Sequence, residues 1–163
     1  MKNIDLRSCF LVLAGALIPV QSAAASGNPL LASGTVTETT GWTTSFDIHA
    51  KGSRQSSLVS ITQGIGGPTS TFSGSVCNGT YTDPTLGGPD VYSVGPVVSG
   101  NEIYGTLYEA FIVHKGGPLG ADYAWSVPAN LPTRASAQAF CRTVSTITPA
   151  FAVDAATDLV FNV

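Results

Sequence analysis

Short stretches in which apolar and polar residues alternate recur along the chain from residue 34 onward. A period of two places alternate side chains on opposite faces of a β-strand. Thr, Val, Ile, Phe and Tyr dominate these stretches, and Gly, Pro, Asn and Ser clusters typical of turns separate them. The pattern predicts strands at residues 34–40, 43–50, 57–63, 69–77, 91–98, 103–114, 123–127, 135–147 and 159–163.

Two segments also carry helix signals. Residues 99–118 place Ser99 and Glu102 at capping-box spacing and end in Lys-Gly-Gly-Pro, and residues 133–142 have a helical composition. Gly105 and the β-branched and aromatic residues favour a strand in the first segment, and alternation that continues through Val144 favours a strand in the second. We therefore expect an all-β fold, an antiparallel β-sandwich of the Ig-like or jelly-roll-like kind.

The first 25 residues have the features of a secretory signal peptide. Lys2 and Arg7 precede an apolar run of about a dozen residues, and Ala23 and Ala25 form an A-x-A cleavage pattern. The prediction is a cleaved signal peptide at 1–25, a loose leader at 26–33 and a single β-domain over 26–163. The protein is then secreted, to the periplasm or to the extracellular surface.

Removal of the signal peptide leaves an even number of cysteines. Cys9 leaves with the peptide, and Cys77 and Cys141 remain. Because an exported chain meets an oxidising compartment, these two are expected to form a disulfide. The alternative, a reactive or metal-binding thiol, finds no Lys, Arg or His beside Cys77 to favour a thiolate.

Composition limits the classes of function. Charged residues make up 10% of the chain and the formal net charge is −3, so no basic patch for nucleic acid is expected. No second apolar segment is long enough for a transmembrane helix. No Walker loop, Rossmann glycine pattern, H-E-x-x-H, C-x-x-C or G-x-S-x-G motif occurs, so we expect no cofactor and no catalytic residues.

Two pairs of polar residues invite a chemical interpretation. Asp47 and His49 are two apart on one predicted strand and share a face, as a base and its orienting carboxylate do. Asp83 and Asp90 bracket a Gly- and Pro-rich loop, and such loops can bind calcium. Neither pair has the further ligands or spacing of a metal site, so we interpret the first as a solvated strand face and the second as a turn.

Exposed aromatic residues would be a further candidate for a ligand-binding surface. The candidates for a ligand-binding face are Trp42, Tyr104, Tyr108 and Trp125. Flat rings with a polar tip suit sugars or partner proteins, but they equally suit the rim of a core.

In composition and layout the chain loosely resembles pilin subunits of the chaperone–usher type, which are short, rich in Thr and Gly, built of strands and closed by one disulfide. It departs from them in the mid-chain position of Cys77, in Asn162 at the place of their penultimate tyrosine, and in lacking an alternating apolar donor strand before Val36. We therefore do not assign it to that family.

The expected function is that of an exported, non-enzymatic cell-surface structural or assembly subunit, pilin- or adhesin-like. It would meet a protein partner or a further copy by strand addition, because Leu159, Phe161 and Val163 end the chain on an alternating apolar strand. The alternatives are a secreted glycan- or protein-binding module that uses the aromatic face, and a small secreted hydrolase.

Overall fold

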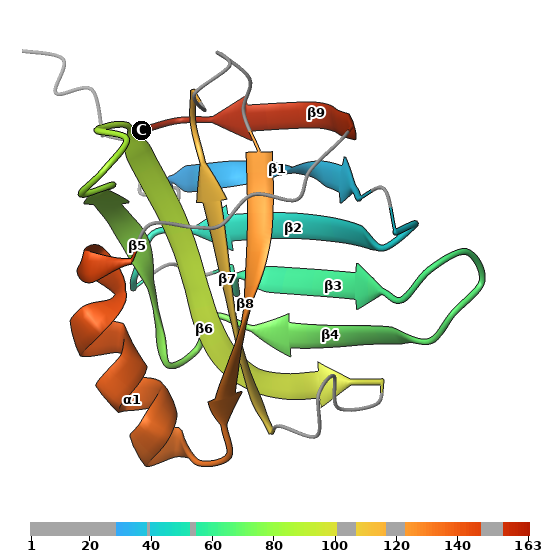
Figure 1. Cartoon of the computed structure of the whole chain (residues 1–163). Coiled ribbons are helices and arrows are strands. Elements are labelled where there is room, and N and C mark those ends of the chain that lie inside the picture. The colour runs from blue at the N-terminus through green and yellow to red at the C-terminus, as the bar shows by residue number, and fades with distance from the viewer. Residues whose placement is uncertain (1–28, 39, 53–54, 101–106, 117–122, 148–154) are drawn as a thin grey trace, which may run out of the picture.

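One antiparallel β-sheet and one α-helix make up the described part of the chain (Figure 1). The structure is a computed structural model and describes residues 29–38, 40–52, 55–100, 107–116, 123–147 and 155–163. The strands are β1 (Leu30–Thr37), β2 (Thr43–His49), β3 (Leu58–Thr62), β4 (Thr69–Ser73), β5 (Cys77–Thr82), β6 (Pro89–Ser99), β7 (Tyr108–His114), β8 (Tyr123–Leu131) and β9 (Ala155–Phe161). The helix is α1 (Arg134–Thr143), followed by a 3₁₀ turn at Val144–Thr146.

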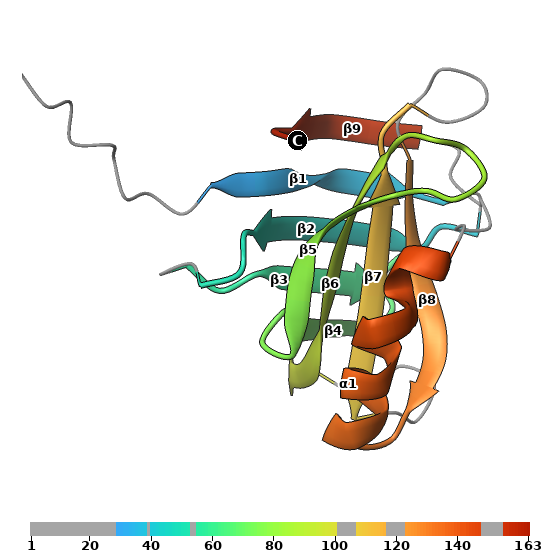
Figure 2. The same ribbon diagram turned by 90° about the vertical axis from the view of Figure 1, so that its left-hand side faces the viewer.

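The sheet curls over itself. Its order is β8-β7-β6-β4-β3-β2-β1-β9, with β5 paired to β6 outside this path. In Figure 1, β7 and β8 cross β1–β4 at a steep angle, and Figure 2 shows the same crossing after a quarter turn. The predicted antiparallel β-structure is confirmed. The two separate sheets of a sandwich are not, because the described strands join in one curled sheet.

The layers are joined at a bend in β6. Residues 89–94 of this strand pair with β5, whereas Val97 and Ser99 pair with β4. Gly95 lies between these two parts, and a Cβ there would stand 1.5 Å from the carbonyl oxygen of Ser73. Only glycine lets the two backbones pass this closely, as is common where a strand turns a corner.

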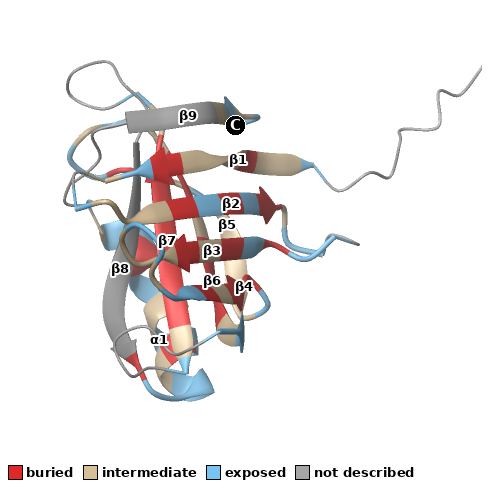
Figure 3. Ribbon diagram, turned by 90° about the vertical axis from the view of Figure 1, so that its right-hand side faces the viewer, coloured by how far each residue is buried: buried red, intermediate tan, exposed pale blue. Residues whose placement is uncertain are grey.

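A first apolar cluster fills the space between the layers. Its fully buried members are Ala32, Val36, Phe46, Ile48, Val59, Ile61, Phe72, Val91, Phe111 and Val113. The rings of Phe46 and Phe111, one from each layer, have centroids 5.0 Å apart. Figure 3 shows buried segments, in red, on β1–β4 and on β7.

A second cluster lies on the opposite face of β6 and β7, beneath α1. It joins Val94, Ala110 and Leu131 to Ala137 of the helix. Since Phe111 and Val113 belong to the first cluster and Ala110 to the second, β7 is buried on both faces. Strands of this kind have a continuous apolar sequence instead of an alternating one, which explains why the 99–118 segment was ambiguous.

The predicted strand at 135–147 is wrong, because this segment forms α1. The hydroxyl of Thr133 accepts a hydrogen bond from the Ser136 N–H (3.1 Å), and the Ser136 hydroxyl accepts one from the Thr133 N–H (3.0 Å), which closes a capping box. The helical segment turns one apolar face toward the sheet. Ala137, Phe140 and Cys141 pack in the second cluster and Val144 is buried, which is the i, i+3, i+4 and i+7 spacing of an amphipathic helix. The alternation of alanines concealed this helical period, since alanine is a strong helix former.

Several boundaries also differ from the prediction. β1 begins at Leu30, so the end of the predicted leader is part of the sheet. Asn78 and Gly79 lie inside β5 and pair with Ser93 and Tyr92, where a turn was expected. The signal peptide predicted at 1–25 lies outside the described residues.

The predicted disulfide between Cys77 and Cys141 is confirmed. It ties β5 to α1 over a sequence separation of 64. Half-buried Val76, Tyr92 and Phe140 pack in the second cluster together with the two cysteines. The bond therefore holds the helix on the face of the sheet that it covers.

Replacing both cysteines by serine should lower the free energy of unfolding by about 4 kcal/mol, because the loop of 64 residues is no longer closed in the unfolded chain. Urea unfolding followed by circular dichroism measures this, and reduction of the wild-type protein should give a similar loss. An unchanged urea midpoint in the double variant would show that the bond contributes nothing to stability.

Candidate functional site

The predicted Asp47–His49 pair lies on the outer face of β2. Asp47 is exposed and His49 is buried, and the His49 Nε2 stands 3.6 Å from Asp47 Oδ1. The nearby Ser57 hydroxyl accepts hydrogen bonds from the His49 N–H (2.9 Å) and the Asn78 side chain (2.8 Å) and donates to the His49 carbonyl (3.3 Å). This serine connects the end of β2 to the Asn78 side chain, and its proton is directed at the His49 carbonyl oxygen and not at the imidazole.

The candidate aromatic residues are spread over different parts of the molecule. Trp42 packs on the first apolar cluster, and Tyr108 packs on the second. Trp125 lies on β8 opposite Ile112, and Tyr104 lies outside the described residues. A ligand-binding face built from these four residues therefore stays a prediction.

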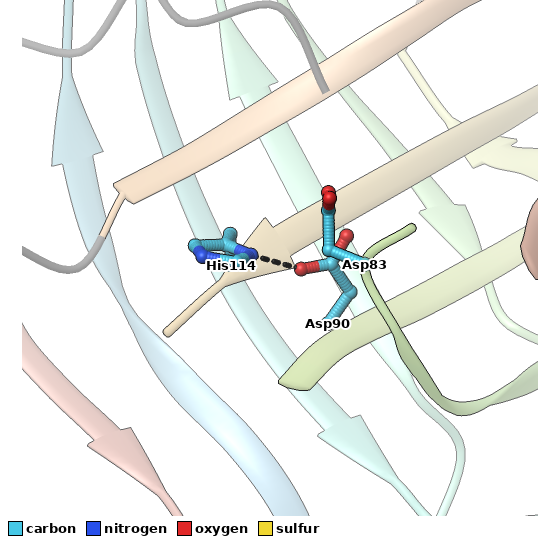
Figure 4. A group of neighbouring side chains, drawn as sticks. All are labelled: Asp83, Asp90 and His114. Carbon is cyan, nitrogen blue, oxygen red and sulfur yellow. Dashed lines mark hydrogen bonds and ion pairs between the residues drawn. The ribbon is translucent and has the colours of Figure 1, made fainter. Parts of the chain in front are cut away.

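A group of buried polar side chains is the most distinctive chemical feature of the described residues. Asp83, Asp90 and His114 are at most 1% exposed, and each places one potential ligand atom within 4.8 Å of the others. We call these three residues the polar centre. They come from the loop after β5, the start of β6 and the end of β7 (Figure 4).

The loop between β5 and β6 fixes the position of Asp83. Its Oδ1 accepts hydrogen bonds from the N–H groups of Thr85 (2.7 Å) and Leu86 (2.6 Å), the pattern of an Asx turn. Its backbone N–H donates to the Gly88 carbonyl at 2.9 Å. The loop is therefore a compact turn, as predicted from its composition, and it directs the Asp83 carboxylate into the protein.

Strand register brings Asp90 and His114 together. The two residues are directly opposite each other in the β6–β7 pair, and Asp90 Oδ1 is hydrogen-bonded to His114 Nδ1. A Cβ at Gly88 would stand 2.9 Å from the His114 ring and 2.7 Å from the Lys115 carbonyl oxygen. Glycine at this position lets the loop lie flat against the imidazole.

Burial determines the protonation behaviour of the groups around Asp90. It raises the pKa of Asp90, the Asp83 carboxylate adds to this, and Tyr81 and His114 act in the opposite direction. The Tyr81 hydroxyl donates to the Ile147 carbonyl oxygen (2.8 Å), and burial together with Asp90 raises the pKa of that hydroxyl. Tyr81 is thus a neighbour of the polar centre, and its hydrogen bond links β5 to the end of the helical segment.

The polar centre is closed to solvent, which argues against catalysis on a dissolved substrate. A surface depression lies elsewhere, between the β2–β3 loop and the start of β5, and is lined by polar residues that include Lys51, Gln55, Ser57 and Asn78. None of its lining residues belongs to the polar centre.

The sequence identified Asp83 and Asp90 but gave no role to His114. The missing information was the hairpin register: pairing residues 90–96 with 108–114 places Asp90 opposite His114. The pairing register of a strand that is buried on both faces cannot be predicted from its sequence pattern. A shift of one residue would still leave its apolar side chains buried, so the pattern favours neither register.

Glu109 is a second buried acid, at the other end of β7. It is fully buried, and neither carboxylate oxygen has a hydrogen-bond partner. Burial raises its pKa to about 8, so the group is protonated at neutral pH. Its backbone pairs with Gly95, which places the acid where β6 bends.

The edges of the sheet are a third feature with functional meaning. Within the described part of the chain, β5, β8 and β9 each have a strand partner on one side only. β9 is held to β1 at its end by Asn162, whose backbone N–H donates to the Leu31 carbonyl (2.9 Å) and whose side chain donates to the Leu30 carbonyl (3.0 Å). Its other edge has no recorded strand.

Comparison with known proteins adds no family. No family model matches the chain, and neither a curated protein nor a solved structure is significantly similar to it. None of the described helices is long and apolar enough to cross a membrane. Function must therefore be argued from the molecule itself.

Replacing Glu109 by glutamine should change how stability depends on pH. The folded protein holds the Glu109 proton up to about pH 8, whereas the unfolded chain releases it near its ordinary pKa of 4.5. Folding therefore retains a proton across this window, and the stability of the wild type falls as pH rises through it. Relative to wild type, Glu109→Gln should gain on the order of a few kcal/mol between the two ends of the window.

Urea unfolding at a series of pH values measures this difference. Glu38→Gln, the same substitution in the turn after β1, is the comparison, and the change with pH should be larger for Glu109→Gln than for Glu38→Gln. A difference for Glu109→Gln that stays flat would show that Glu109 ionises in the folded protein as it does in the unfolded chain.

Proposed function

We propose that this protein is an exported structural domain that assembles with a second copy of itself by strand addition at the outer edge of β9. The observation that carries the proposal is that β9 pairs with β1 along one edge and, among the described residues, has no strand along the other. An unpaired edge presents a row of N–H and C=O groups that another strand can satisfy.

The three edge strands are not equally open. β5 is bound to α1 and the segment after it by the disulfide and by the hydrogen bond from Tyr81 to Ile147. β8 contains Pro128, which cannot donate to a neighbouring strand. β9 has neither form of protection among the described residues, so it is the edge best suited to pairing.

The composition of β9 also favours association. Its sequence, AATDLVF, contains one charged residue and no proline or lysine, the residues that natural proteins use to block edges. Val160 is 45% exposed and Val163 is 42% exposed. Pairing of the same edge in two copies gives a closed, two-fold contact, the commonest arrangement in homo-oligomers.

The proposed setting is outside the cytoplasm. The charge, apolar run and small residues at 1–25 support export, and a disulfide persists in oxidising compartments. The low content of charged residues suits a structural subunit whose surface is meant to meet other protein. The glycan-binding and hydrolase alternatives gain no specific observation from the described residues.

Lysine at position 160 should weaken self-association, because a charged side chain at an edge disfavours pairing with another strand. Analytical ultracentrifugation over a range of concentrations should show a dimer for wild type and an at least about tenfold higher dissociation constant for Val160→Lys. The matched control is Leu58→Lys, since Leu58 is 43% exposed but lies on β3, which is paired on both sides.

The control should associate like wild type. A wild-type protein that remains monomeric at its highest soluble concentration would overturn the proposal, as would equal weakening by the two lysine variants. Circular dichroism of each variant establishes that the fold is unchanged before the comparison is made.

A further inference from the structure

The polar centre has a composition that the proposed assembly function does not use. It combines one imidazole with two carboxylates from three separate segments of the chain, and all three residues are at most 1% exposed. Acidic residues alone are common on surfaces without any ion, but here a histidine accompanies them and solvent is excluded. Buried groups of this kind are normally paired, protonated or bound to metal.

The polar centre brings together donor atoms that a metal ion can use. Two carboxyl groups and one imidazole each place one potential ligand atom within 4.8 Å of the others, and all three side chains are shielded from solvent. Oδ2 of Asp90 is buried without a hydrogen-bond partner. Figure 4 shows the three side chains close together, with a dashed line from Asp90 to His114.

The surrounding backbone holds these side chains in place. The Asx turn occupies Oδ1 of Asp83 and fixes the direction of that carboxylate, while strand pairing sets Asp90 opposite His114. Gly88 lets the loop pack against the imidazole. Metal sites need this kind of outer support, because it orients the ligands before the ion arrives.

We propose that Asp83, Asp90 and His114 form a binding site for one divalent transition-metal ion of the zinc class. Imidazole nitrogen with carboxylate oxygen suits Zn²⁺, whereas Ca²⁺ and Mg²⁺ take oxygen ligands. The ion takes the place of the proton between His114 Nδ1 and Asp90 Oδ1, and that proton moves to Nε2 or to solvent. The site pins the β5–β6 loop to β6 and β7, so its role is structural.

Zinc is the probe that tests the proposal. Untagged, oxidised full-length protein is stripped with a chelator, exchanged into metal-free buffer, incubated with excess Zn²⁺ and desalted. Elemental analysis should find one zinc ion per chain, and thermal unfolding should shift upward with zinc concentration, because an ion that binds only the folded state stabilises it.

The chain contains its own matched control. His49 is the only other histidine, and it is also buried and near an aspartate. His49→Gln should keep stoichiometric zinc, whereas His114→Gln and Asp90→Asn should lose it. Equal loss in His49→Gln and His114→Gln would overturn the assignment.

A measurement on the wild type keeps the test decisive if the variants do not fold. X-ray absorption at the zinc edge should show nitrogen and oxygen neighbours at about 2.0–2.2 Å with the scattering pattern of one imidazole and no sulfur. Zinc without an imidazole neighbour would overturn the proposal. So would stripped wild-type protein that takes up no zinc and shows no thermal shift, which would leave the polar centre as a hydrogen-bonded His–Asp pair.

Discussion

The close passage of β6 over β4 is the constraint on which the rest of the fold depends. At Gly95 the backbone approaches the Ser73 carbonyl more closely than any side chain would allow. One strand can therefore pair with β5 and β7 in one layer and with β4 in the other. The bend turns a single sheet into two facing layers with an apolar space between them, so burial of β1–β4 follows from it.

The same bend gives β7 two apolar faces. One face closes the cluster between the layers, and the other needs a cover of its own. α1 provides that cover, and the Cys77–Cys141 disulfide attaches the helix to β5. The helix is short, and of its residues Ala137 is the buried one, so the covalent bond adds to a modest apolar contact. A fold with a limited second core gains most from such a bond.

The chain has few charged residues, yet several of them are inside. His114 and Glu109 mark the two ends of β7, and being five residues apart they point to opposite faces of the strand. Glu109 avoids a buried charge because it keeps its proton, whereas His114 is hydrogen-bonded to Asp90. These interior groups affect stability. The outer edge of β9, where we propose that association takes place, lies on a different part of the sheet.

The sequence by itself determined the parts of this protein that depend on local period and composition. The alternation of apolar and polar residues predicted most of the strands, and Gly and Pro residues predicted the turn at Asp83. The even number of cysteines left after the signal peptide predicted the disulfide. Tertiary structure decided the rest. The helix at 134–143 forms because its apolar face has a sheet to cover and its cap is satisfied, although the alanines alternate as in a strand. His114 meets Asp90 and Asp83 because of a strand register that no local pattern encodes. Pairing across a sheet is a non-local choice, settled by which apolar faces can be buried together, and that is a property of the whole chain.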